Sequence, residues 1–193
     1  MLEFKKPLGS QQDRTERILL GAWIAIAIFA LVSLFLLPAE ATEAGQETAR
    51  VDCGIRWLLR DAPHWGLAAN DLARDEMAGQ IAQAARAHGV PPLLLAVVVY
   101  RESSFDVSAE GHAGERGLLQ VHGLAARGCD LSTAAGQLDC GARWLATCRE
   151  TCGDWRGAMS AYVSGRCEPQ TKRTQWVATS RLRQWGKAER ECK

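Results

Sequence analysis

The sequence predicts a mainly α-helical domain preceded by one membrane-spanning helix. Apolar residues recur at helical spacing in several segments, no segment alternates like a convincing strand, and one apolar run of 20 residues near the N-terminus carries no charge. A length of 193 residues suits one ordinary domain with an appendage. With 47% hydrophobic and 23% charged residues, the chain is neither disordered nor fibrous.

The apolar run occupies residues 18–37, from Ile18 to Leu37. A helix of this length rises roughly 30 Å, which matches the hydrocarbon core of a bilayer. Four Lys/Arg residues lie in residues 1–17, whereas Arg50 alone follows within residues 38–52. The positive-inside rule then places residues 1–17 in the cytoplasm and exports the remainder. We therefore expect an inner-membrane protein with a single span and a periplasmic domain.

Cleavage of this segment is the alternative. The tripeptide Ala39-Glu40-Ala41 has the small-x-small form of a signal-peptidase site. The apolar run is longer than the roughly 7 to 15 residues of a signal peptide, which favours a retained anchor. Either outcome places the domain in the periplasm.

Residues 38–52 are predicted to be a linker, and residues 53–193 the folded domain. The segment 38–50 is small, polar and acidic without large apolar residues, as in a tether. Ile55, Trp57, Leu58 and Leu59 suit a short amphipathic helix that ends before the breaker Asp61-Ala62-Pro63.

Two helices follow in close succession. From Asp71 to His88 apolar residues recur at helical spacing, and Gly89 stands where a left-handed cap would end the helix. Pro91-Pro92 suits the first turn of the next helix, in which residues 93–100 are apolar on all sides. This second helix is expected at the centre of the core.

The remainder of the domain is predicted to be a loop followed by helices. Residues 106–115 mix Gly, Ser, Glu and His without periodicity, which indicates a loop. Further helices are expected over 133–149, 155–163 and 174–185.

All seven cysteines follow the apolar run, which agrees with an oxidising compartment. Their number predicts three disulfides and one odd thiol. Spacing alone does not fix the pairing, but Cys129 with Cys140 and Cys53 with Cys192 would close loops across the domain. Cys148 and Cys152 share a helical face, yet no CxxC or His-x-x-x-His accompanies them, so we expect no metal and no cofactor.

Glu102 is the candidate for acid–base chemistry. It ends the most hydrophobic helix of the domain and is followed by Ser103, Ser104 and Phe105. A carboxyl removed from water prefers its neutral form, so its pKa rises and it can donate a proton near neutral pH. Capping or ion pairing at the helix end is the structural alternative.

An ordered set of short motifs surrounds Glu102. The pieces are Glu102-Ser103-Ser104-Phe105, Ala109, Gly114, Gly117-Leu118-Leu119-Gln120, Gly141, Leu145, Ala158, Ala161-Tyr162 and Gly165. In this order and at these separations, over roughly residues 78–166, the chain resembles the lysozyme-like lytic transglycosylases of the SLT type. Each piece alone, such as Gly-Leu-Leu-Gln, is weak evidence.

The resemblance implies cleavage of the β-1,4 bond between N-acetylmuramic acid and N-acetylglucosamine in peptidoglycan, with Glu102 as the single catalytic carboxylate and a 1,6-anhydro sugar as product. It also implies that Ser104 and Gln120 bind the sugar or support the cleft. The hydroxyl of Tyr162 is expected to point at Glu102. The family's Asn after this tyrosine is replaced by Val163, which puts one polar contact in doubt.

Two alternatives remain open at this point. Asp106, Glu110 or Glu115 could serve as a second carboxylate, which would make the protein a hydrolytic lysozyme of the same fold. The replacement at Val163 instead motivates an inactive assembly module that binds glycan or a partner.

The charge distribution bears on partners. A net charge of +1 provides no general attraction for nucleic acid, so no nucleic-acid partner is expected. The C-terminal segment is basic through Lys172, Arg173, Arg181, Arg183 and Lys187, which suits wall polymers, lipid headgroups, an acidic partner or a solvated helix face. A short anchored enzyme resembles the transglycosylases of type IV secretion, conjugation, pilus assembly or phage entry.

Overall fold

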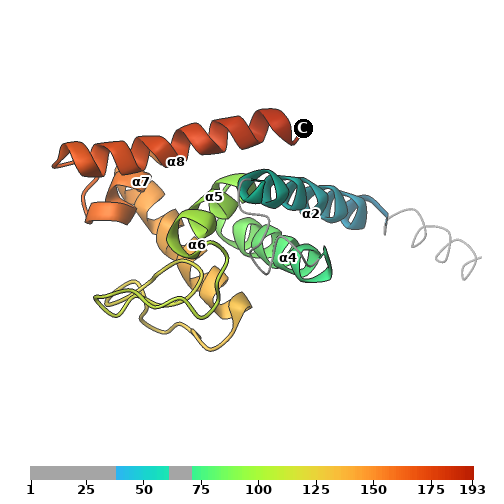
Figure 1. Ribbon diagram of the computed structural model, residues 1–193, viewed down its shortest axis with the longest axis horizontal. Coiled ribbons are helices and arrows are strands. Elements are labelled where there is room, and N and C mark those ends of the chain that lie inside the picture. Colours follow the sequence, from blue (N-terminus) through green and yellow to red (C-terminus); the bar gives the residue numbers. More distant parts are fainter. Residues whose placement is uncertain (1–37, 61–70) are drawn as a thin grey trace, which may run out of the picture. The chain divides into compact units, whose positions relative to one another are not determined.

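The computed structural model describes residues 38–60 and 71–193. These residues form the helices α2 (Pro38–Leu59), α4 (Asp71–His88), α5 (Pro92–Ser103), α6 (Ala134–Cys152), α7 (Trp155–Ser164) and α8 (Lys172–Glu191) (Figure 1). Within these ranges the β-structure is limited to isolated bridges from Arg116 to Glu110 and to Val121. The mainly helical fold predicted from the sequence is confirmed. The predicted cytoplasmic segment 1–17 and membrane helix 18–37 lie outside the described residues.

In the described ranges, no single helix has both the length and the apolar composition needed to cross a bilayer. Ala73–His88 and Pro92–Ser103 pass that test on length and composition only when taken together, and they are bent by 118° at the break between them.

Helix α2 differs from the linker that we expected over residues 38–52. The helix is continuous from Pro38, and the compact unit begins at Ala44. Val51 and Ile55 are fully buried, and Glu47 forms an ion pair with Arg86 on α4. The Ala, Glu and Gln residues of this segment are strong helix formers, so low apolar content does not indicate a tether here.

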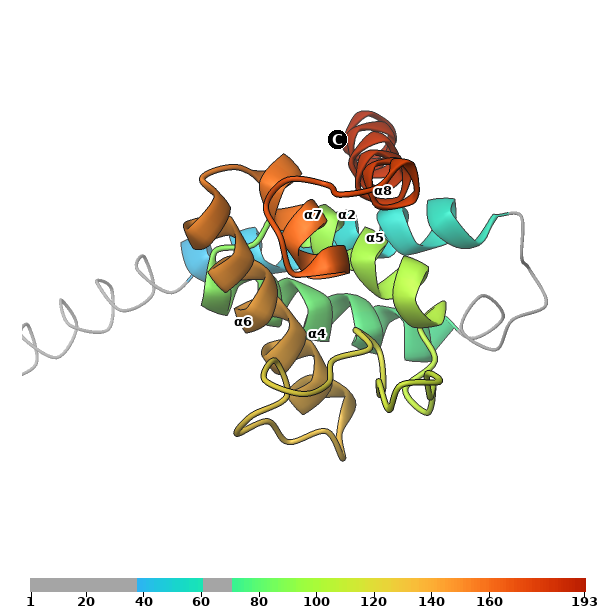
Figure 2. The same cartoon turned by 90° about the vertical axis from the view of Figure 1, so that its left-hand side faces the viewer.

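Helix α5 lies at the centre of the core, as predicted. All seven residues from Leu93 to Val99 are buried, and the helix packs against α4 and α8 (Figure 2). The preceding helix α4 ends at His88 and is followed by Gly89, whose φ of +64° suits glycine. The next amide, that of Val90, donates to the Ala85 carbonyl at 2.9 Å. This tight turn sets the position at which α5 enters the core.

The three C-terminal helices begin at side-chain caps. Thr133, Asp154 and Thr171 each accept a backbone N–H of the first turn of α6, α7 and α8. Helix α7 packs against both α6 and α8, and α8 also packs against α5. Helix α8 is longer than the predicted 174–185 segment, and Arg181 in its middle contacts Glu102 in the last turn of α5.

Both expected disulfides are present, and a third joins Cys152 to Cys167. Cys148 is the odd thiol and is buried. Because Cys152 is bonded to Cys167, it does not form a thiolate pair with Cys148. The bond between Cys53 and Cys192 links α2 to the residue after α8, so the C-terminal helix is covalently held to the domain.

Candidate active site

Glu102 lies in the last turn of α5, where this buried helix reaches the edge of the core. Its side chain is 18% exposed. The next turn is tight: Ser104 adopts φ of 56° and its amide donates to the Tyr100 carbonyl at 3.0 Å. The burial of residues 93–99 fixes α5, and α5 in turn fixes the carboxyl at a boundary between the core and solvent.

Arg181, from the middle of α8, is the ion-pair partner of Glu102. Its Nη2 lies 2.7 Å from Oε1 of Glu102, and the arginine is only 6% exposed. The basic C-terminal segment predicted from the sequence therefore has one member that faces inward. This role could not be predicted from the sequence, because the two partners are 79 positions apart.

Opposing influences act on the pKa of Glu102, and the net result is a rise. Burial is the largest and raises the pKa by disfavouring the charged carboxylate. The charge and the hydrogen bond of Arg181 lower it, and the negative charge of Glu115 raises it further. The raised pKa has the direction and the main cause that we predicted from the apolar sequence before Glu102.

Tyr162 projects from α7, and its hydroxyl donates to the Leu119 carbonyl at 2.6 Å. This contact differs from the expected one, in which the hydroxyl points at Glu102. Burial raises the tyrosine's pKa well above its usual range, and the charge of Glu102 raises it as well, so the two side chains interact electrostatically. The hydrogen bond from Tyr162 to the Leu119 carbonyl connects α7 to the Gly117–Gln120 segment beside Glu102.

The polar side chains around this segment hold its backbone. The side-chain amide Nε2 of Gln120 donates to the backbone carbonyls of Ala109 and Gly117, at 3.1 and 2.9 Å. Ser103 donates to the carbonyl of Leu118 at 3.0 Å and is a contact that the sequence prediction missed. The hydroxyl of Ser104 faces the carbonyl of Tyr100 at 3.5 Å, a weak contact within its own helix turn.

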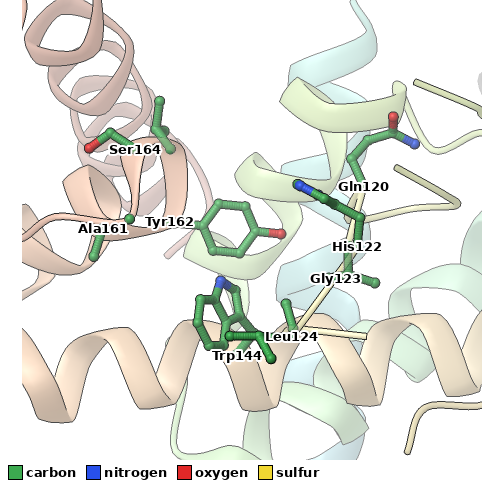
Figure 3. A pocket seen from close by; sticks show the side chains of 12 residues that line it. Gln120, His122, Gly123, Leu124, Trp144, Ala161, Tyr162 and Ser164 are labelled. Carbon is green, nitrogen blue, oxygen red and sulfur yellow. The ribbon is translucent and has the colours of Figure 1, made fainter. Parts of the chain in front are cut away.

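A pocket of about 460 Å³ opens next to Tyr162. Its walls come from the segment after the Gly117–Gln120 turn, from α6 through Trp144, and from the end of α7. The lining residues are Gln120 to Ala125, Trp144 and Ala161 to Gly165. In Figure 3 the Tyr162 hydroxyl points across the pocket toward Gln120 and His122, and Trp144 lies close to the tyrosine ring. The size falls in the usual range for small-ligand sites.

The predicted site residues divide into two groups. Gln120 and Tyr162 line the pocket, as does Val163, whereas Glu102 and Ser104 do not. Glu102 is connected to this pocket through the Gly117–Gln120 segment, whose Leu118 carbonyl accepts from Ser103 and whose Leu119 carbonyl accepts from Tyr162. The wall where the family's Asn would stand is thus apolar.

The possible second carboxylates lie in the loop between α5 and α6. Asp106 is exposed and accepts hydrogen bonds from the amide and hydroxyl of Ser108, which lower its pKa. Glu110 is exposed and pairs through its backbone with Arg116. The carboxylate of Glu115 accepts from the Ala113 amide, and backbone hydrogen bonds lower its pKa. Of these three, Glu115 is the one whose charge acts on Glu102.

No group of three or more potential metal ligands comes together in the part of the chain that the structure describes.

Comparison with known proteins adds one match. The family model described as the transglycosylase SLT domain matches residues 79–181, which reach from α4 to Arg181 on α8 and include every predicted site residue. Neither the curated proteins nor the solved structures yield a significant match.

Proposed function

The chain belongs to the transglycosylase SLT domain family, whose members are lytic transglycosylases of peptidoglycan, and we propose that Glu102 is its single catalytic carboxylate. The observation that carries this assignment is the position of Glu102: a largely buried carboxyl with a raised pKa, at the end of the central helix and next to Ser103, which holds the same backbone segment as Tyr162 in the pocket wall.

The proposed reaction cleaves the β-1,4 bond between N-acetylmuramic acid and N-acetylglucosamine. Protonated Glu102 donates its proton to the glycosidic oxygen as the bond from that oxygen to the anomeric carbon breaks. The N-acetyl group of the substrate stabilises the positive anomeric carbon. The carboxylate of Glu102 then takes the proton of the C6 hydroxyl, whose oxygen bonds to the anomeric carbon. The product is a 1,6-anhydro sugar, and water is not consumed.

The surrounding residues hold the backbone next to Glu102 and provide the surface that would contact the glycan. Gln120 and Tyr162 keep the Gly117–Gln120 segment in place through hydrogen bonds to its backbone carbonyls. Trp144 and Tyr162 give the pocket aromatic surface, which suits the apolar faces of sugar rings. We propose that the glycan strand occupies this pocket with its scissile bond directed toward Glu102.

Product analysis distinguishes this reaction from hydrolysis. Glu115 is the competing second carboxylate because its charge acts on Glu102, but it is partly exposed and hydrogen-bonded within its own loop. Digestion of purified peptidoglycan by the full chain should release muropeptides with 1,6-anhydro ends in mass spectrometry. Reducing ends in their place would show that water is the acceptor and that the enzyme is a lysozyme.

We further propose that the domain acts in the periplasm, held by residues 18–37 in the inner membrane. Three disulfides in the described residues agree with an oxidising compartment, and the wall substrate lies outside the cytoplasm. Local opening of the wall for a secretion, conjugation or phage machine fits the small size of the domain.

Fractionation tests the location. A C-terminal fusion to a phosphatase that is active only outside the cytoplasm should show activity in the membrane fraction. Activity in the soluble periplasm would indicate cleavage near Ala41, and an inactive fusion with intact protein would contradict export.

A further inference from the structure

Arg181 is the residue that the proposed chemistry has not yet used. It extends from α8 toward the end of α5, and its Nη2 donates to Oε1 of Glu102 at 2.7 Å. The side chains of the two partners are 7% and 18% exposed, so water screens their interaction weakly. Helix α8 packs against both α5 and α7, the helices that carry Glu102 and Tyr162. The charge of Arg181 therefore acts on both Glu102 and Tyr162.

The other hydrogen-bonding groups of this guanidinium argue against a purely structural role. Nε and Nη1 of Arg181 are buried and have no hydrogen-bond partner in the described part of the chain. An arginine that braces a fold ordinarily distributes its donors over several acceptors. Arg74 shows the contrast within the same domain: it is equally buried, and its Nε bonds Asp52 on α2. Arg181 is directed at Glu102.

Charged and titratable groups approach Glu102 from each neighbouring element. Glu115 acts from the loop, Tyr162 from α7, and Cys148 on α6 acts on Tyr162 in turn. Arg101, next to Glu102 in sequence, is exposed and instead donates to Gln184 on α8. The positive charge that acts on Glu102 therefore comes from Arg181.

We propose that Arg181 is a positioning residue that orients the Glu102 carboxyl and stabilises its negative charge between the two proton transfers. This inference rests on the proposed role of Glu102. A carboxyl that is first an acid and then a base exists briefly as a carboxylate in a partly dry site. A carboxylate without a counterion there would be strongly disfavoured. Arg181 supplies that counterion and does not itself line the pocket.

Removal of the charge should change the pH dependence of the reaction. Glu102 must be protonated to act, so activity falls as pH rises through its pKa. Arg181 lowers that pKa, and its removal leaves burial and Glu115, both of which raise it. In Arg181→Met and Arg181→Gln, the alkaline limb of the kcat profile should therefore move to higher pH. The weaker acid should also lower kcat by about tenfold, with KM little changed.

Two further variants complete the design in the full chain. Arg181→Lys retains a positive charge without the forked geometry of the guanidinium. The alkaline limb of its kcat profile should therefore lie between those of the wild type and the uncharged variants. Arg183→Met removes an exposed charge from the same helix and should behave as the wild type. Because ionisation rather than the folded fraction sets the position of the limb, residual activity in either uncharged variant is sufficient for the measurement.

The outcomes separate the two claims. The role of Arg181 is supported if the alkaline limb of the kcat profile moves to higher pH in Arg181→Met or Arg181→Gln but not in Arg183→Met. A limb at the wild-type position in the uncharged variants overturns it. If Glu102→Gln retains wild-type activity on the same substrate, the assignment of Glu102 fails first, and the pH profiles of the Arg181 variants lose their premise.

Discussion

Glu102→Gln is expected to lower peptidoglycan cleavage by about a thousandfold or more, because the amide can neither donate the proton nor accept the second one. Gln preserves the shape of the side chain, and its oxygen can still accept from Arg181. The fold should therefore survive, although the buried guanidinium loses its counterion and some stability is lost. Turbidity assays with the purified full chain, together with thermal unfolding, measure both effects.

The matched control is Glu115→Gln. Glu115 is a partly exposed glutamate whose charge also acts on Glu102, so its removal tests the charge of the loop without touching the proposed acid. We expect cleavage to remain within about a few fold of the wild type, because a partly exposed loop charge that water screens contributes little. Comparable loss in both variants would indicate a two-carboxylate mechanism, and full activity of Glu102→Gln would remove Glu102 from the chemistry.

Gly117→Ala is expected to cost about 3 kcal/mol in the free energy of unfolding and most of the activity. Gly117 has φ of +71°, and a Cβ there would overlap the amide of Gln137. The side-chain amide of Gln137 is buried and makes three hydrogen bonds. Its oxygen accepts the Leu118 N–H at 2.8 Å, and its nitrogen donates to the carbonyls of Val107 and Leu131. Strain in the backbone adds to the steric overlap. Chemical denaturation measures the loss.

Gly114→Ala separates these two contributions. Gly114 lies in the same loop with φ of +87°, but nothing lies within 4 Å of the position that a Cβ would take. The substitution therefore costs the backbone strain alone, about 1 kcal/mol. Equal destabilisation of the two variants would show that contact with Gln137 is not what constrains the Gly117–Gln120 segment.

Local features of the fold were readable from the sequence because neighbouring residues determine them. The glycine cap after α4 and the proline start of α5 depend on backbone geometry within a few positions, and both occur where predicted. The all-apolar run from Leu93 to Val99 requires burial on every side, which places α5 at the centre. The location of Glu102 at the end of α5 follows from the same run.

Contacts between distant segments were not readable in this way. Nothing local in α8 distinguishes Arg181 from Arg183, yet one faces Glu102 and the other is exposed. The Tyr162 hydroxyl also finds a carbonyl 43 residues away rather than Glu102. The linker prediction failed because helix formers without large apolar residues were interpreted as a tether, while Val51 anchors the helix to the core.

The central claim is that burial keeps the Glu102 carboxyl protonated more readily than an ordinary glutamate, even beside Arg181. Carbon-13 NMR of the full chain, with glutamate side chains labelled and Glu102→Gln used to assign the resonance, follows this carboxyl directly as pH is varied. We predict a titration midpoint above that of a glutamate in an unstructured peptide. A midpoint at or below that reference would contradict the account, because Glu102 would then be held as a carboxylate and would lack the proton that the reaction requires.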